Sequence, residues 1–128
     1  MVTINSAKAF WIHDKTGSLE EGKLGDILVM KAKNDDPYEN LVNAGMKDIE
    51  LLVLAGKPIY GEMRFLDIFK GHLNKNTMLP EGYTRIRVEK KEMFVKGDPA
   101  GLYNEVRKKI GFNKKLDYLP FEPLEEGL

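Results

Sequence analysis

The sequence predicts a mainly β protein with a few short helices, an α+β fold, and two kinds of pattern support this prediction. Residues 27–30 and 49–54 are nearly continuous apolar runs, which are typical of buried strands. Residues 83–89 alternate between apolar and charged side chains, as a half-buried strand does. Turn residues separate these segments, so we expect short strands joined by tight connections.

The N-terminal part begins with a short helix expected over residues 2–10, capped by Thr3 or Asn5. A helix of this length is only marginally stable alone in water, so it needs a surface to pack on. Residues 10–12, with the sequence Phe-Trp-Ile, are three bulky apolar residues in a row. We expect them to pack in a core rather than to stack on a ligand.

The first strand is expected over residues 27–33, buried on both faces, with Asp26 at its start. The Asp26 carboxylate can accept hydrogen bonds from backbone N–H groups of the preceding turn and so fix where the strand begins. After the strand, Asp36 and Pro37 predict the start of a helix, and Gly45 is expected to end it.

A hairpin is expected next, with a strand over residues 49–54, a turn over 55–58 and a return strand that begins at 59–61. The Gly56-Lys57 pair resembles the end of a phosphate-binding loop, but the upstream glycine that such a loop requires is missing. We therefore interpret it as a hairpin turn.

The C-terminal half starts with a short amphipathic helix expected within residues 62–75 and stopped by Gly71. A strand over 83–89 follows, and its imperfect alternation allows a bulge near Thr84. Residues 93–95 are a further strand candidate.

The last predicted helix begins at Asp98 and Pro99, a strong start signal, and ends at Gly111. Residues 112–128 contain two prolines and are expected to form an extended tail with enough apolar residues to dock on a surface. The apolar residues of the helix are at helical spacing; they are Leu102, Tyr103, Val106 and Ile110.

The composition of the 128 residues excludes several classes of function. Lys+Arg and Asp+Glu both number 20, so the chain offers no electrostatic case for nucleic acid or an anionic membrane as a partner. The absence of cysteine excludes disulfides, thiolate metal sites and a cysteine nucleophile. No apolar run approaches the ~20 residues of a membrane span, and no signal-peptide core is present, so a cytoplasmic location is expected.

A resemblance to a known family lies in residues 17–29, Gly-Ser-Leu-Glu-Glu-Gly-Lys-Leu-Gly-Asp-Ile-Leu-Val. They resemble the C-terminal signature of the amidohydrolase superfamily of metal-dependent hydrolases, Gly-x-Ile/Leu-x-x-Gly-x-x-Ala-Asp-Ile/Leu-Val. Gly25 stands where that signature usually has alanine. The matching positions are Gly17, Leu19, Gly22, Lys23, Asp26, Ile27 and Val29.

Two flanking segments extend the resemblance to roughly residues 2–61. Residues 2–10 resemble the Thr-x-Asn-x-Ala helix that closes the catalytic barrel of that family. Residues 48–61 resemble its Val-x-Val-x-Gly-Lys hairpin, so Gly56 and Lys57 join the structural motif.

The resemblance implies half of a composite β-sandwich of the kind found beside an amidohydrolase (β/α)₈ barrel. Residues 1–61 would be the end-of-barrel helix and sandwich part, and residues 62–128 a strand-helix extension that packs on the same domain. A barrel takes about 250 residues, which this chain cannot contain. Met1, directly before the barrel-closing helix, indicates a truncated chain, a split gene or a fragment.

The catalytic chemistry of that family is not found in this sequence. The resemblance implies metal ligands that include a His-x-His pair, further histidines and an aspartate, with zinc or another divalent metal in the full-length parent. The two histidines here, His13 and His72, form no such pair. No residue is therefore assigned a catalytic, cofactor-binding or metal-binding role. Nucleophile-elbow serines and a Gly-x-Gly-x-x-Gly loop are also missing.

We therefore expect the C-terminal, non-catalytic portion of an amidohydrolase-like enzyme that hydrolyses C–N bonds of amides, cyclic amides or amino-heterocycles. The portion would brace the barrel, and it would be inactive alone. Its partners would be the barrel and, in a homo-oligomer, further copies. Two alternatives remain open: a stand-alone β module that binds a ligand or protein, and an accessory subunit of a split hydrolase.

Overall fold

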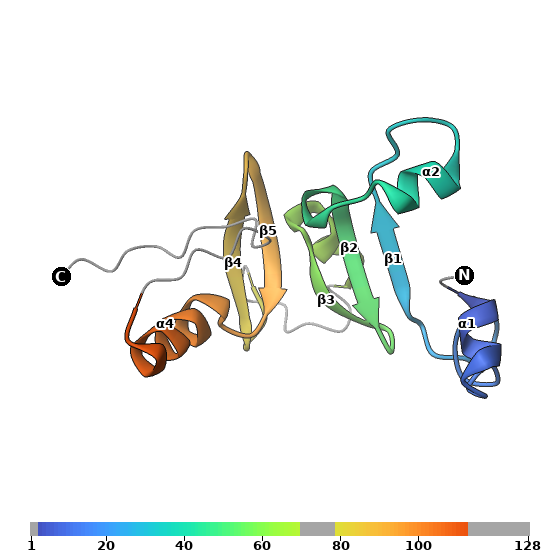
Figure 1. Ribbon diagram of the computed structural model, residues 1–128, viewed down its shortest axis with the longest axis horizontal. Coiled ribbons are helices and arrows are strands. Elements are labelled where there is room, and N and C mark those ends of the chain that lie inside the picture. The colour runs from blue at the N-terminus through green and yellow to red at the C-terminus, as the bar shows by residue number, and fades with distance from the viewer. Residues whose placement is uncertain (1–2, 70–78, 113–128) are drawn as a thin grey trace.

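The structure is a computed structural model that describes residues 3–69 and 79–112. The described residues form a five-stranded antiparallel sheet in the order β1-β2-β3-β5-β4, flanked by short helices (Figure 1). This architecture confirms the predicted mainly β, α+β fold class. The strands are β1 (Ile27–Met30), β2 (Ile49–Leu54), β3 (Lys57–Glu62), β4 (Tyr83–Val88) and β5 (Lys91–Lys96). The helices are α1 (Ile4–Ala9), α2 (Pro37–Val42), α3 (Leu66–Phe69) and α4 (Pro99–Ile110), with 3-10 turns η1 (Met46–Asp48) and η2 (Met63–Phe65).

β1 lies at one edge of the sheet and pairs with β2. The strand ends at Met30 rather than at residue 33, and Ile27 and Leu28 are exposed. The prediction of a strand buried on both faces was therefore wrong. An apolar run marks a strand, but it does not say whether the group that would cover the strand belongs to the same chain.

The β2–β3 hairpin has a two-residue turn, Ala55-Gly56, in which both residues have positive φ angles, 49° and 74°. This left-handed pair matches the twist of antiparallel strands, and it makes the turn tighter than the expected span of 55–58. Pro58 faces Val53, and the register shifts between Leu52 and Val53. Proline has no N–H to give to the ladder, which accounts for an irregularity there.

The β4–β5 hairpin has a regular register from Tyr83 opposite Lys96 to Val88 opposite Lys91. The bulge allowed near Thr84 is therefore absent from this pair, and that expectation was wrong. β5 is also longer than residues 93–95 and pairs with β3, so it joins the two hairpins into one sheet.

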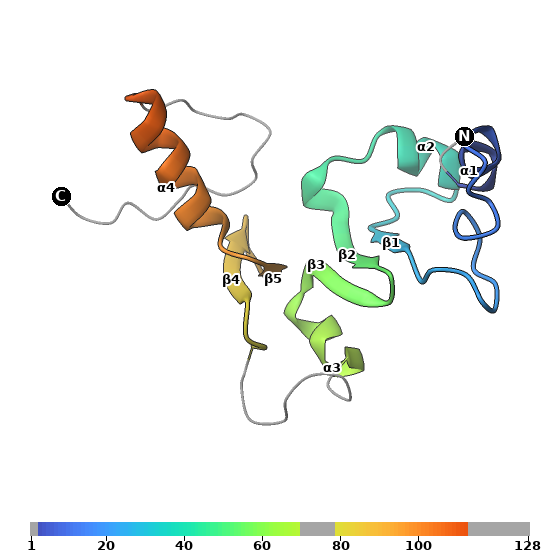
Figure 2. The ribbon, with the colours of Figure 1, turned by 90° about the horizontal axis from the view of Figure 1, so that it is seen from below.

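The main apolar cluster consists of Leu51, Val53, Leu66 and Phe94. Met93, the neighbour of Phe94 in β5, is also buried, and it points to the opposite face of the sheet. Leu66 comes from α3, which Figure 2 shows beside β3. Phe94 is fully buried, and the Tyr83 ring tilts against it at a centroid distance of 6.1 Å. The core therefore contains residues from the family-like hairpin and from the C-terminal strands.

The first two helices differ in how they begin. Thr3 is at the N-cap position of α1, but neither Thr3 nor Asn5 caps the helix with its side chain, so the predicted caps were wrong. Asp36 caps α2 as predicted and accepts from the N–H groups of Tyr38 and Glu39 at 2.8 and 3.2 Å. The helix ends at Asn43 rather than Gly45, which instead begins η1.

α4 has the predicted signals at both ends. Asp98 accepts from the N–H of Gly101 at 2.9 Å, and Gly111 has the left-handed φ of 76° that a helix end requires. The rest of the predicted 62–75 helix, including Gly71, and most of the 112–128 tail lie outside the described residues. The division of the chain into an N-terminal part, residues 1–61, and an extension, residues 62–128, stays a prediction. Within the described part, no helix is long and apolar enough to cross a membrane.

Candidate functional site at the Asp26 junction

Asp26 joins the signature to the hairpin at one end of the sheet. One carboxylate oxygen, Oδ1, accepts from the N–H of Ala55 at 2.8 Å, and the other, Oδ2, accepts from the Thr16 hydroxyl at 2.9 Å. The backbone bond from Ala55, followed by the bond from Thr16, holds the pKa of Asp26 below its ordinary value. We expected a backbone donor from the preceding turn, but the donor is the turn between β2 and β3.

Gly25 and Gly56 bring the same two segments into backbone contact. The N–H of Gly56 donates to the Gly25 carbonyl at 3.0 Å. A Cβ atom on Gly25 would lie 3.3 Å from the Gly56 nitrogen, a close contact that would require the turn to shift by a few tenths of an ångström. Glycine in place of the usual alanine therefore allows a close approach of the hairpin turn.

Gly17 places α1 against the signature. Its φ is 96°, and a Cβ atom there would lie 2.6 Å from the Cβ of Ala7, the buried residue of α1. No other residue type fits this contact without a shift of the helix. The position of α1 is therefore fixed relative to the beginning of β1.

The remaining motif residues lie in turns and on the surface. Gly22 has a φ of 85° with open space around it. The Lys23 ammonium donates to the Ser18 hydroxyl at 2.7 Å and pairs with Glu20 at 3.3 Å, so Lys23 closes the turn. Leu19 is exposed, and Lys57 is the first residue of β3.

An exposed apolar segment follows α1, and we call Phe10, Trp11 and Ile12 the N-terminal apolar surface. Phe10 and Trp11 are 76% and 85% exposed, so the prediction that residues 10–12 pack in a core was wrong for this chain. Trp11 also has a φ of 58°, a left-handed conformation that is strained for a bulky residue. The described chain does not cover this surface.

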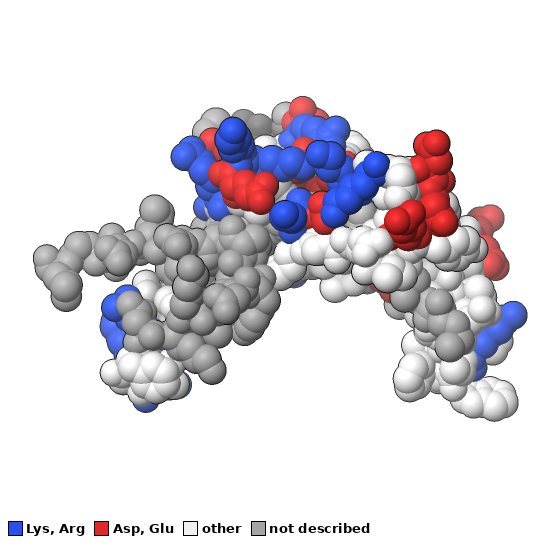
Figure 3. All heavy atoms as spheres, turned by 45° about the horizontal axis from the view of Figure 1, so that its top comes forward, with Lys and Arg blue, Asp and Glu red and all other residues white. Residues whose placement is uncertain are grey.

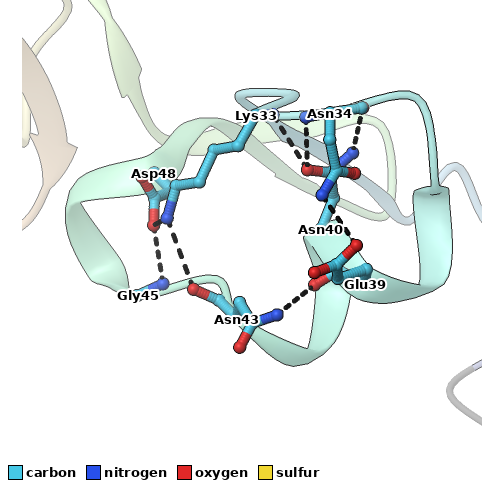
Figure 4. A network of polar contacts seen from close by, with 7 residues as sticks. All are labelled: Lys33, Asn34, Glu39, Asn40, Asn43, Gly45 and Asp48. Atoms are coloured by element: carbon cyan, nitrogen blue, oxygen red, sulfur yellow. Dashed lines mark hydrogen bonds and ion pairs between the residues drawn. The ribbon is translucent and has the colours of Figure 1, made fainter.

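A polar network organises the loop between β1 and β2 (Figure 4). Its centre is Asp48, only 5% exposed, which accepts from the Lys33 ammonium at 2.6 Å and from the N–H of Gly45 at 2.9 Å. The Lys33 ammonium also donates to the Asn43 carbonyl at 3.3 Å. The bond from Gly45, then the bond from Lys33, lower the pKa of Asp48.

The other half of this network is held by Asn40. Its amide oxygen accepts from the N–H groups of Lys33 and Asn34 at 2.8 and 3.1 Å, and its amide nitrogen donates to the Asn34 carbonyl at 2.7 Å. The Asn34 amide donates in turn to Glu39 at 2.9 Å. The Lys31 N–H still donates to the Asp48 carbonyl at 2.8 Å, and beyond it the Asn40 side chain of α2 supplies the acceptor for the backbone of Lys33 and Asn34.

A cluster of charges lies at the ends of β2 and β3 that are farthest from Ala55 and therefore from Asp26. Figure 3 shows that basic and acidic side chains gather in the upper part of that view. Arg64 pairs with Glu62 at 2.8 Å and with Glu50 at 2.9 Å, and Lys91 pairs with Glu62. Burial would raise the pKa of Glu62, but the bonds from Lys91 and Arg64 outweigh it and lower the pKa. The cluster connects β2, β3 and β5.

The family-like segments, α1, the signature and the hairpin, meet around Asp26. Residues 1–59 match the model of the Amidohydrolase family. The matched residues include α1, β1, β2 and the first residues of β3. Comparisons of the chain with curated proteins and with solved structures each found no match.

The metal that the amidohydrolase resemblance implies does not fit the described residues. Between residues 3 and 69 and between 79 and 112, no three His, Cys, Asp or Glu side chains gather as a metal site requires. At the junction, both oxygens of Asp26 already accept hydrogen bonds from protein groups. No reaction step is therefore derived from these side chains.

The Asp48 network is not predicted by the sequence, in which Lys33 is expected in a strand and Asp48 has no assigned role. One signal was present: an acidic residue three positions after the N-cap of a short helix is the spacing of a capping box, and Asp48 follows Gly45 at that spacing.

Proposed function

We propose that this chain is the C-terminal, non-catalytic portion of a metal-dependent amidohydrolase-like enzyme. The match of residues 1–59 to the Amidohydrolase family carries this proposal. The whole enzyme would hydrolyse C–N bonds in amides, cyclic amides or amino-heterocycles. Zinc or another divalent metal would be held by a catalytic barrel outside residues 1–128.

The role of this portion would be to brace that barrel through the N-terminal apolar surface. Phe10 and Trp11 together expose aromatic area of the kind that dominates protein interfaces. The contact between Gly17 and Ala7 fixes α1, so the surface is presented in a defined orientation. The strained backbone at Trp11 is consistent with a conformation kept for an interaction.

The first experiment identifies the native polypeptide. The DNA upstream of the Met1 codon is read, and the protein is recovered from its source cells with an antibody against residues 79–112 for intact mass and metal analysis. We expect an in-frame barrel with a His-x-His strand, a mass far above 14.6 kDa and bound divalent metal. A chain of 14.6 kDa that copurifies with a separate barrel would indicate a split hydrolase, and one found alone would indicate a stand-alone module.

The second experiment tests the bracing surface in that native polypeptide. Trp11→Ala should lower its midpoint of thermal unfolding and its hydrolytic activity together, because an interface aromatic is lost. Tyr38→Ala is the matched control, since Tyr38 is an equally exposed aromatic on α2. If the two variants changed the unfolding midpoint and the activity equally, this would contradict packing of Trp11 on the barrel.

A further inference from the structure

We propose that the acidic C-terminal segment, residues 116–128, docks on the sheet face opposite Phe94, over the β4–β5 hairpin. We call this face the second face. Residues two positions apart on a strand share a face, so Met93 and Val88, which pairs with Lys91, both belong to it. An apolar row also crosses it, because the register places four residues opposite one another: Leu28, Leu52, Tyr60 and Val95.

The two edges of the second face differ in exposure. Leu28, on the edge strand β1, is 48% exposed, whereas Val88, on the edge strand β4 and beside a hairpin turn, is only 3% exposed. Met93, on the neighbouring strand β5, is 1% exposed, and the Tyr60 hydroxyl oxygen is also buried. A side chain on an edge strand is this buried only when a further group covers it, so the β4–β5 half of the second face has a cover.

The described helices do not account for this cover. α3 lies on the first face, where Leu66 packs in the cluster with Phe94. Figure 2 shows α4 and α2 on the other side of the sheet, but neither helix has a buried residue. The buried Ala7 of α1 is next to Gly17 instead. We therefore assign the cover to residues outside 3–69 and 79–112.

Of the two longer segments outside those ranges, the C-terminal one has the matching chemistry. Residues 70–78 follow α3 on the first-face side, and their large apolar residues are Leu73 and Met78. Residues 116–128 follow α4 on the second-face side and contain a richer apolar set, which includes Tyr118, Leu119, Phe121 and Leu124. Pro120 and Pro123 favour an extended backbone and have no N–H to donate, so the segment docks through side chains rather than as a sixth strand.

Charge favours the same half of the sheet. Residues 116–128 contain four acidic side chains and no lysine or arginine, whereas residues 83–96 contain five basic and two acidic side chains. Arg85 and Lys96 share the face of Phe94, so they attract the segment over a distance of about 10 Å rather than by contact. Residues 1–62 have seven basic and ten acidic side chains, so the β1–β2 half offers no such attraction.

A tethered segment does not need the contact area of a separate partner. α4 ends at Ile110, six positions before the segment begins, so the segment is held near the sheet at a high effective concentration. The β4–β5 hairpin and α1 lie at opposite ends of the molecule in both ribbon views, so docking leaves the N-terminal apolar surface accessible (Figures 1 and 2). The inference therefore does not depend on the proposed function.

The test is methionine oxidation of the folded 128-residue chain by hydrogen peroxide, followed by peptide mass spectrometry. Met93 should oxidise at least about tenfold more slowly than Met46, which is 43% exposed. Phe121→Ser should accelerate oxidation of Met93 by at least about fivefold, because it weakens the cover. Met63, which packs against the first-face cluster, should keep its rate.

Two matched controls accompany this variant. Phe10→Ser removes a phenylalanine that is 76% exposed at the other end of the molecule, and it should leave Met93 unchanged. Reversal of the adjacent glutamates, Glu125→Lys with Glu126→Lys, should accelerate oxidation of Met93 by about two- to threefold at low salt. The same reversal at Glu20 and Glu21, an adjacent pair in an exposed turn, should not.

Three results would overturn the proposal. The first is a wild-type Met93 that oxidises as fast as Met46, which would mean that the second face has no cover. The second is a Phe121→Ser variant in which Met93 keeps its wild-type rate, which would assign the cover to other residues. The third is equal acceleration of Met63 and Met93, since the segment would then support the whole fold rather than cover one face.

Discussion

The Asp26 carboxylate and the N–H of Ala55 form a 2.8 Å hydrogen bond across 29 positions of sequence. The neighbouring residues repeat the connection, since Gly56 donates to the Gly25 carbonyl. Consecutive residues before β1 thus hold consecutive residues of the hairpin turn. The segment before β1 and the hairpin turn are therefore one structural unit.

Replacement of Asp26 by alanine should open this unit. The N–H of Ala55 loses its acceptor, and we expect its hydrogen exchange to accelerate by about tenfold while the amides of β5 change little. Asp14→Ala is the control, because Asp14 is an exposed aspartate in the turn after α1. If both variants exchange alike at Ala55, the carboxylate does not hold the turn.

Gly61 should tolerate no side chain. A Cβ atom there would lie 2.9 Å from Leu51 Cδ1, 3.0 Å from Phe94 Cζ and 3.1 Å from the Glu50 carbonyl oxygen. Gly61→Ala should therefore lower the free energy of unfolding by about 1–3 kcal/mol, the usual cost of overpacking a core, as measured by urea denaturation.

Gly45→Ala provides the control for that substitution. Its new methyl group would approach only Asp48, at 3.9 Å, and the φ of Gly45 is −112°, which any residue adopts. The stability should change by no more than about 1 kcal/mol in either direction. If Gly45→Ala lowered the free energy of unfolding as much as Gly61→Ala does, this would argue against close packing around Gly61.

The sequence predicted the elements that local chemistry determines. The strand over 49–54, the strand expected over 83–89 and observed over 83–88, and the helix starts at Asp36 and Asp98 follow from patterns within a few residues of each other. A capping carboxylate and an apolar alternation act over one turn or one strand, so they can be identified without knowledge of the remaining fold.

The sequence could not predict what depends on distant partners. Trp11 looks like a core residue in any apolar run, and only the three-dimensional arrangement shows it exposed. The partner of Asp26 at Ala55 and the pair of Lys33 with Asp48 join residues many positions apart. Such contacts are set by the strand order, which a single sequence does not specify.

Stability should fall in acid because of Asp26 and Asp48. Their hydrogen bonds hold both pKa values below the ordinary 3.8 in the folded chain and are lost on unfolding, so the unfolded chain binds protons at higher pH. The stabilisation is complete above about pH 5 and is lost as pH falls through 3.8 toward the folded pKa values. Glu20 and Glu62, whose pKa values are also lowered, act in the same direction.

Thermal unfolding between pH 7 and pH 3 measures this dependence. The midpoint should be nearly constant above about pH 5 and should fall steeply below about pH 4. An Asp26→Asn, Asp48→Asn double variant should unfold at a lower temperature at pH 7 and show a shallower acid slope. A wild-type midpoint that rises on acidification would contradict the assignment.

Two tyrosines of the sheet should respond oppositely to loss of the hydroxyl group. The Tyr83 hydroxyl donates to the Pro58 carbonyl at 2.6 Å and so connects β4 to β3. The buried Tyr60 hydroxyl has no hydrogen-bond partner among the described residues, and burial, followed by the charge of Glu62, raises the pKa of Tyr60. A buried hydroxyl without a partner costs free energy, whereas a bonded one contributes about 1 kcal/mol.

Tyr60→Phe should therefore leave the free energy of unfolding unchanged or raise it, by up to about 1–2 kcal/mol, while Tyr83→Phe should lower it by about 1 kcal/mol. Each variant removes one oxygen atom from an aromatic ring on the same sheet, so each serves as the control for the other in urea denaturation. Because both rings keep their packing, a difference between the variants reports the hydroxyl environment alone. A loss of stability in Tyr60→Phe as large as in Tyr83→Phe would mean that the Tyr60 hydroxyl is hydrogen-bonded in solution.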